Sequence, residues 1–310
     1  MRYLKELTDG SRIQGVYYCK SKLSTVTKAG KPYDSLVLQD KTGSLDTKVW
    51  EPNNAGIGEY EAGDFIEVNG DVVVFNGAYQ GRLTRIRRCS EDEYDIADYM
   101  PATKKNIDEM FTELLAIADS VKDEHYHALL DLFFREEAFA KAFRKSSAAK
   151  TVHHAFIGGL LEHTLSVAQI CEFQCGKYPL LKHDLLITSA LLHDIGKTTE
   201  LSEFPANDYT DEGQLIGHIV TGTILISEKI KMIEGFPEDK AAVLKHCILA
   251  HHGELEFGSP KRPALIEALA LNMADNMDAK IETFSETLEA NDREGWLGYS
   301  KFLDSNIRRT

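Results

Sequence analysis

The hydrophobic period of this chain changes near residue 103, and that change constrains the fold more than any other feature. Upstream, short runs of aromatic and β-branched residues are separated by Gly, Asn and Asp, a pattern typical of strands joined by turns. Strands are predicted at residues 12–19, 35–39, 44–50, 63–74 and 79–87. Five strands with no long helix between them predict a small antiparallel β-barrel, with an OB-fold as the best candidate and an SH3-like barrel as the alternative.

Downstream of this change, apolar residues recur at every third or fourth position, beginning with Ile107, Met110 and Leu114. That spacing is the period of an amphipathic helix. Further helical patterns follow at residues 125–134, 136–144, 159–175, 182–193, 215–232, 238–251 and 263–282. The second domain is therefore predicted to be all-α. The barrel is expected at residues 1–90, an acidic linker at 91–105, and the helical domain at 106–310.

Charge is unevenly distributed along the 310 residues, whose net charge is −14. Residues 1–90 hold 13 basic and 11 acidic side chains, a net charge of +2, whereas the remainder holds 22 and 38, a net charge of −16. The acidic whole therefore does not exclude a nucleic-acid partner for the first domain. The last predicted strand carries a cationic run that is either a solvated strand edge or a patch contacting phosphates: Arg82, Arg85, Arg87 and Arg88.

The composition also bears on the compartment. No apolar run reaches the ~18 residues that suggest a transmembrane helix, so no membrane partner is expected. The five cysteines are scattered and form neither a CxxC pair nor a disulfide framework. Their pattern predicts a reducing cytoplasm.

Six of the eleven histidines form a spaced series along the predicted helices: His154, His163, His193, His218, His251 and His252. The dipeptide His193-Asp194 is the most informative, because it follows the apolar run 185–192 and so lies at the inner end of a buried helix. Burying both groups without partners would cost several kcal/mol, so a partner or a metal is expected there. Imidazole and carboxylate ligands suit Mn²⁺, Fe²⁺, Co²⁺, Ni²⁺ or Zn²⁺, and the absence of cysteine ligands disfavours structural zinc.

These residues resemble the H…HD…D motif of the HD-domain phosphohydrolases. The motif matches His163, His193-Asp194 and Asp275. The additional histidines, His218 and the His251-His252 pair, are similar to those of the binuclear branch, which implies two metal ions bridged by Asp194. Spacing alone does not distinguish His251 from His252. Neighbouring residues on a helix diverge by ~100°, so both can bind only if the helix ends there, as Gly253 suggests.

The sequence segments 153–166 and 250–260, which contain His163 and the His251-His252 pair, resemble those of the YhaM-type 3′→5′ exoribonucleases. Those proteins combine an N-terminal OB-fold with an HD domain, the order predicted above. The resemblance covers nearly the whole chain and places the metal core at about residues 150–285. It implies a 3′→5′ exoribonuclease of single-stranded RNA, with single-stranded DNA as a further substrate. Mn²⁺ is the favoured ion, and the resemblance favours a homo-oligomer.

The implied chemistry is phosphodiester hydrolysis by a water that two metal ions activate, with Asp194 and Lys197 as catalytic residues. Lys197 lies one helical turn after His193, where it can contact a phosphate oxygen or cap a helix end. His154 is a candidate substrate contact beside the metals. The alternative function is hydrolysis of small nucleotides or cyclic dinucleotides, with the barrel as a regulatory or assembly module. A non-catalytic RNA-binding protein and a di-iron oxygenase are further alternatives.

The barrel is expected to bind the polymer, because OB-folds hold single strands with cationic grooves and aromatic stacking platforms. Tyr17, Tyr33 and Arg85 are the candidate contacts. Strand faces alternate, so one of the adjacent pair Tyr17 and Tyr18 is expected to face outward. A last aromatic group lies in the polar tail and is expected to pack on its own domain or on a neighbouring subunit: Trp296, Tyr299 and Phe302.

Overall fold

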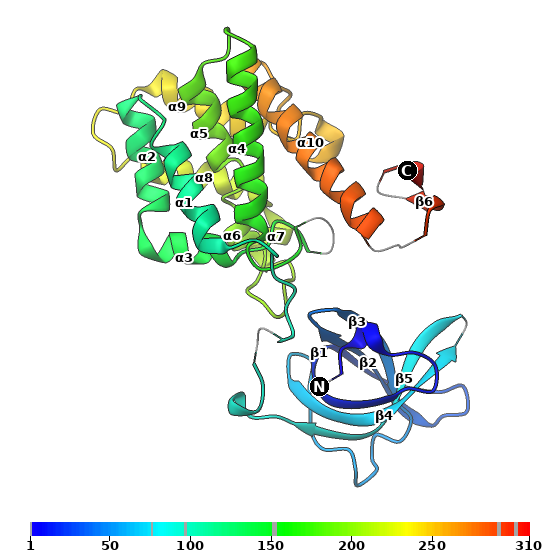
Figure 1. The fold of residues 1–310 in the computed structure, drawn as a ribbon. Helices are drawn as coiled ribbons and strands as arrows, with labels where there is room; N and C mark the ends of the chain where they lie inside the picture. The colour runs from blue at the N-terminus through cyan, green and yellow to red at the C-terminus, as the bar shows by residue number, and fades with distance from the viewer. Residues whose placement is uncertain (1, 76, 96–97, 151–153, 290–292, 301–302) are drawn as a thin grey trace. The chain divides into compact units, whose positions relative to one another are not determined.

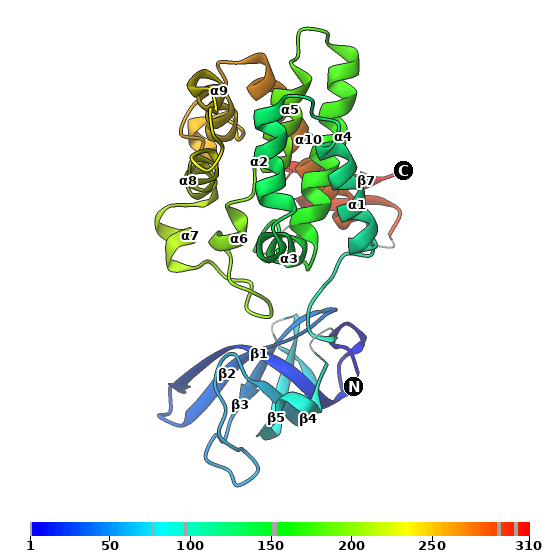
Figure 2. The ribbon, with the colours of Figure 1, turned by 90° about the vertical axis from the view of Figure 1, so that its left-hand side faces the viewer.

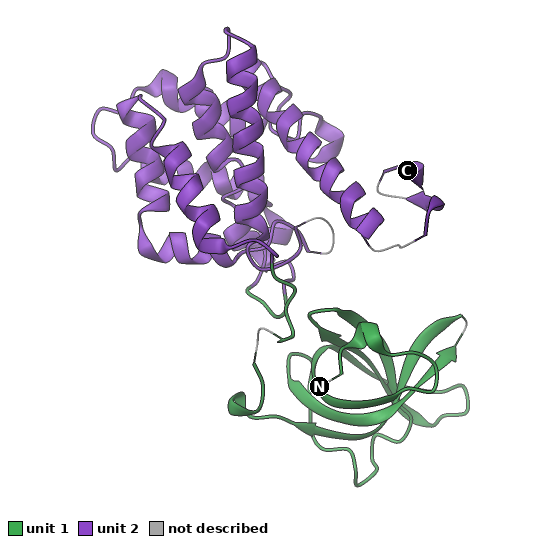
Figure 3. Ribbon diagram, in the orientation of Figure 1, with its two compact units in different colours: residues 1–102, 203–206 green, residues 103–202, 207–310 purple. Residues whose placement is uncertain are grey.

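The computed structural model describes all residues except 1, 76, 96–97, 151–153, 290–292 and 301–302. It divides the chain into two compact units, shown in Figure 3. The first unit contains residues 1–102 and 203–206, and the second contains residues 103–202 and 207–310. The segment expected as a linker therefore belongs largely to the first unit.

The first unit is a closed five-stranded barrel with the strand order β1-β2-β3-β5-β4 (Figure 1). Its strands are β1 (Arg12–Val26), β2 (Pro32–Asp40), β3 (Gly43–Val49), β4 (Phe65–Phe75) and β5 (Ala78–Arg88). All neighbours are antiparallel except β3 and β5, which are parallel. The first half of β1 pairs with β4 and its second half with β2, so one bent strand closes the barrel. This topology confirms the predicted OB-fold-like barrel.

Both tyrosines of the adjacent pair Tyr17 and Tyr18 are buried, which contradicts the prediction that Tyr17 contacts the polymer. Tyr17 points into the barrel core, is 0% exposed, and donates its hydroxyl to the carbonyl oxygen of Arg2 at 2.6 Å. Tyr18 alternates to the other face but is only 4% exposed, because Phe65 and Tyr99 pack over it. The two side chains alternate as predicted, but Phe65 of β4 and Tyr99 of the segment 91–102 cover the outer face.

The second unit is a helical bundle with ten α-helices among its described residues. They are α1 (Ile107–Ala118), α2 (Glu124–Phe134), α3 (Glu137–Lys145), α4 (Gly159–Lys177), α5 (His183–Leu192), α6 (Lys197–Glu200), α7 (Asp211–Leu215), α8 (His218–Ile230), α9 (Glu238–Leu249) and α10 (Ile266–Glu289). Helix α5 packs against α2, α4, α9 and α10, so residues 185–192 are all buried. Figure 2 shows α8 and α9 on one side of the bundle and α1 on the other.

The end of the chain departs from the all-α prediction. Strands β6 (Gly295–Ser300) and β7 (Ser305–Arg309) form an antiparallel hairpin. Trp296 and Tyr299 lie exposed on it, whereas Phe302 falls outside the described residues. The segment is too short to show a helical or strand period in the sequence. Within the described part of the chain, no helix has the length and apolar composition needed to cross a bilayer.

Candidate metal centre

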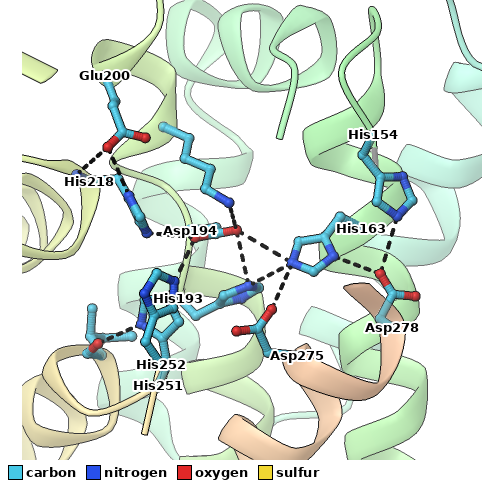
Figure 4. Close-up of polar contacts among 12 residues, drawn as sticks. His154, His163, His193, Asp194, Glu200, His218, His251, His252, Asp275 and Asp278 are labelled. Carbon is cyan, nitrogen blue, oxygen red and sulfur yellow. Dashed lines mark hydrogen bonds and ion pairs between the residues drawn. The ribbon is translucent and has the colours of Figure 1, made fainter. Parts of the chain in front are cut away.

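Four helices and one turn bring the predicted ligands together around Asp194 (Figure 4). His163 projects from α4, His193 caps the C-terminus of α5 with Asp194 next to it, and His218 opens α8. The remaining ligands come from the turn after α9 and from α10: His251, His252 and Asp275. Residues more than 110 positions apart in the sequence thus share one site.

The two carboxylate oxygens of Asp194 face different sets of imidazoles. Its Oδ2 lies 3.4 Å from His163 Nε2 and 3.3 Å from His193 Nε2, and Asp275 Oδ1 lies 3.2 Å from the same nitrogen of His163. Its Oδ1 lies 3.5 Å from His218 Nε2 and 3.6 Å from His251 Nε2. Asp194 therefore stands between two clusters, as the bridging role of the binuclear pattern requires.

The opposite nitrogen of each imidazole is held by an acceptor. The Nδ1 atoms of His193 and His251 donate to the carbonyl oxygens of Ala190 and Ile248, each at 2.7 Å. His252 Nδ1 donates to the carbonyl oxygen of Phe257 at 2.9 Å. These bonds place the proton on Nδ1 and leave Nε2 of each ring as a lone-pair donor toward the centre, which is the usual arrangement of metal-binding histidine.

Two residues that the sequence reasoning missed complete this outer layer. Asp278 Oδ2 accepts from His163 Nδ1 at 2.7 Å, and Glu200 Oε1 accepts from His218 Nδ1 at 2.9 Å. Asp278 lies one helical turn after Asp275 on the same helix, and that spacing was the available signal. Glu200 ends the short helix α6 and carried no comparable signal.

Buried polar atoms without hydrogen-bond partners indicate that these residues fit a metal ion. Asp194 Oδ1, His218 Nε2 and His251 Nε2 are buried, and none of them has a hydrogen-bond partner among the described residues. Buried polar groups are normally satisfied, so three such atoms aimed at one point indicate a cation between them. The ligand atoms form two compact groups that could each hold an ion: His163, His193 and Asp275 in one, and His218, His251 and His252 in the other.

Backbone contacts explain how both halves of the site form. Helix α9 ends at Leu249, so His251 and His252 lie in a turn closed by Gly253 at φ +78°, and both rings can reach the second group. Gly196, two residues after Asp194, lies against α8. A Cβ at Gly196 would come within 2.1 Å of the carbonyl oxygen of His218, so glycine allows the approach that brings His218 to Asp194.

The protonation states suit ligation at most positions. Burial lowers the pKa of His251 and of His252, so both rings are neutral at pH 7. Burial alone would raise the pKa of Asp194, but Lys197 and His193 lower this pKa well below the usual value. His163 is the exception. Burial disfavours its charge, yet the neighbouring aspartates raise the pKa of His163 well above normal. A metal ion must therefore displace a proton from His163.

Lys197 lies at the centre beside Asp194, whereas His154 is buried behind the ligand His163. Lys197 Nζ lies 2.6 Å from Asp194 Oδ2, so its cation stands directly at the centre. His154 is 2% exposed and its Nε2 contacts Asp278 at 3.2 Å. This burial corrects the prediction that His154 contacts substrate. The ring lies behind the ligand His163, because it packs on the carboxylate that orients that ligand.

The predicted nucleic-acid contacts of the barrel differ in their exposure and in their ion pairs. Tyr33 is half-buried and stacks on the exposed ring of Trp50, with centroids 5.0 Å apart. Among the predicted cationic run, Arg87 is paired with Glu67 and Glu93, and Arg88 with Asp64. Arg82 and Arg85 are exposed, and no ion pair is found for either within the described residues. The run is thus partly a paired strand edge and partly free cationic surface.

The fold and the site define a two-domain protein with an OB-fold-like barrel and an HD-type metal centre, and the HD domain family model matches residues 160–280. The chain belongs to the family of the YhaM 3′-5′ exoribonucleases. It is 33% identical to the Bacillus velezensis member over 283 residues, covering 90% of this chain and 88% of that one. The Bacillus subtilis member is 32% identical with the same coverage.

Solved structures also match part of the chain. One is the second OB-fold domain of replication protein A from Methanococcus maripaludis, with 23% identity, a TM-score of 0.24, and coverage of 29% of this chain and 95% of that one. Another is a mitochondrial single-stranded DNA binding protein of S. cerevisiae, with 15% identity, a TM-score of 0.22, and coverage of 26% and 97%.

Proposed function

We propose that this protein is a metal-dependent 3′→5′ exoribonuclease that degrades single-stranded RNA, with single-stranded DNA as a further substrate. The observation that carries this proposal is Asp194, which presents one oxygen to each of two clusters of ligand atoms. Membership of the exoribonuclease family supports the choice of substrate and direction. Scattered free cysteines fit activity in a reducing cytoplasm.

We assign one divalent cation to His163, His193, Asp194 and Asp275, and a second to Asp194, His218, His251 and His252, with Mn²⁺ favoured for both. Bound there, the ions supply Lewis acidity to the phosphate and acidify the attacking water. The chain itself contributes orientation. Each imidazole is held at Nδ1, so its Nε2 does not need to reorganise on binding.

Lys197 is the residue proposed to contact the scissile phosphate. Burial would lower the pKa of Lys197, but Asp194 outweighs that effect and raises the pKa above its ordinary value, so the ammonium group stays charged. A cation in contact with Asp194 can also donate to a phosphate oxygen held at the same centre. In this role Lys197 neutralises charge on the phosphoryl group as the bond breaks.

Upstream contacts with the RNA are proposed for the barrel. The stacked pair Tyr33 and Trp50 offers an aromatic face for a base, and Arg85 offers an exposed guanidinium for the backbone. Because residues 1–90, which contain the five barrel strands, carry a net charge of +2, the barrel can hold the polyanion while the more acidic helical unit performs hydrolysis.

The decisive experiment incubates the protein and Mn²⁺ with 5′-labelled single-stranded RNA, and in parallel with a cyclic dinucleotide and a nucleoside triphosphate. A ladder that shortens progressively from the 3′ end is expected. Asp194→Asn and His193→Ala should abolish it while circular dichroism stays unchanged, whereas Leu180→Glu, at an exposed position outside the site, should not. Intact RNA together with cleavage of a small nucleotide would instead establish the alternative function.

A further inference from the structure

Helix α10 carries a stripe of six apolar side chains on its outer face. Each is between 37% and 55% exposed, although most apolar residues of this unit are buried. The α10 stripe consists of Ile266, Leu269, Met273, Met277, Ile281 and Phe284. The helix packs on α4, α5 and α9 through its other face (Figure 1). A stripe of this length has no covering partner within the described part of the chain.

The spacing of the α10 stripe is symmetric about Asp275. Met273 and Met277 lie two residues on either side, Leu269 and Ile281 lie six, and Ile266 and Phe284 lie nine. Nine residues at about 100° each amount to two and a half turns, so the stripe lies on the face opposite Asp275. The metal ligand therefore points inward while the stripe points out.

We propose that the α10 stripe is the interface with a second copy of this chain, packed antiparallel across a two-fold axis near position 275. A two-fold interface is self-complementary, so each stripe residue must meet the residue at the mirrored position in the partner. The symmetric spacing meets that condition. Leu269 faces Ile281, Ile266 faces Phe284, and Met273 faces Met277. An unrelated partner would require no such symmetry.

The charges at the two ends of α10 favour the same orientation. Lys261 lies just before the helix, whereas Glu282 and Glu286 lie in its last two turns. Arg262 and Glu289, at the same two ends, are already paired with Glu254 and Lys104 of the same chain. An antiparallel copy brings the basic end of one helix beside the acidic end of the other. A parallel copy would set acidic ends together and align the helix dipoles unfavourably.

The exposed area is sufficient for a stable pair. At roughly 100 Å² of exposed surface for each half-exposed side chain, the α10 stripe offers about 600 Å² per copy. Two copies would then bury about 1,200 Å², the lower bound for specific interfaces. A single apolar patch of that size is at the upper limit for a monomer, which is a further reason to expect a partner.

The test is a charge exchange between Leu269 and Ile281, measured on the full chain by sedimentation velocity and light scattering at micromolar concentration. The wild type is expected to be a dimer or an assembly of dimers. Leu269→Glu and Ile281→Lys should each shift it to half that mass, because each buries an unpaired charge. The double variant should restore the wild-type mass. Leu180→Glu, at a more exposed apolar position outside the stripe, is the matched control and should leave the mass unchanged.

The double variant distinguishes orientations. In an antiparallel pair, every Glu at 269 faces a Lys at 281 of the other copy, whereas in a parallel pair like charges face each other. Failure of the double variant to reassociate, with folding intact by circular dichroism, would overturn the antiparallel interface. A monomeric wild type would overturn the proposal altogether and leave the stripe to a different partner. Neither result depends on nuclease activity.

Discussion

Glu200→Gln should weaken one metal site and leave the other intact. The side chain of Glu200 is 11% exposed, and its Oε1 accepts from both Nδ1 and the backbone N–H of His218, at 2.9 and 3.0 Å. Glutamine keeps the length and one acceptor oxygen but removes the charge. The ring of His218 then keeps an acceptor at Nδ1 but loses the negative charge that raises the basicity of Nε2.

The expected magnitude follows from these two bonds. A hydrogen bond to a charged group contributes ~1.5–3 kcal/mol, against ~0.5–1.5 kcal/mol for a neutral pair. Replacing the charge therefore costs about 1–2 kcal/mol, which corresponds to a roughly 5- to 30-fold loss of affinity. This range overlaps the ~10–100-fold loss common when such outer partners of metal ligands are removed.

Calorimetric titration of the metal-free protein with Mn²⁺ measures both sites at once. Glu200→Gln should shift one of two binding events, and Asp278→Asn should shift the other, because Asp278 holds His163 instead. Thermal unfolding of the metal-free variants checks that the fold persists. A single binding event in the wild type, or equal weakening of both events by each variant, would refute the assignment of one carboxylate to each ion.

Four further predictions address pH, RNA binding and packing. Because the pKa of His163 is raised in the metal-free protein, this protonated ring stabilises the fold below pH 6.5 and ceases to do so as pH rises through the raised pKa. Mn²⁺ affinity should therefore increase with pH, with proton release detectable by titration in buffers of different ionisation enthalpy. Trp50→Ala should weaken RNA binding by ~1–3 kcal/mol in an anisotropy assay, whereas Tyr17→Phe should lower stability without changing RNA affinity. Arg85→Ala should reduce the salt dependence of binding by about one phosphate contact. Gly196→Ala should destabilise the protein by more than ~1 kcal/mol in chemical denaturation, since its Cβ would overlap the backbone of α8.

Periodicity was enough to predict the two-domain order and most elements, because strand and helix patterns depend on neighbours within a few residues. The predicted helix at 125–134, for example, begins one residue late and ends at the observed Phe134. The predicted helix at 215–232 was less accurate. It began at Leu215, the last residue of α7, and continued into α8, because the break at Gly217 interrupts the helix without interrupting the apolar pattern.

The sequence by itself determined the residue types of the metal centre. Histidine and aspartate beside a buried apolar run leave few other means of satisfying their polar atoms. Only the tertiary structure decided that Asp194 divides these ligands into two groups, and that Glu200 and Asp278 orient one ring each. It also decided that Tyr17 and Tyr18 are both buried. These outcomes depend on contacts between residues that are distant in the chain. The local hydrophobic pattern does not indicate which segment covers a given face of a strand or helix.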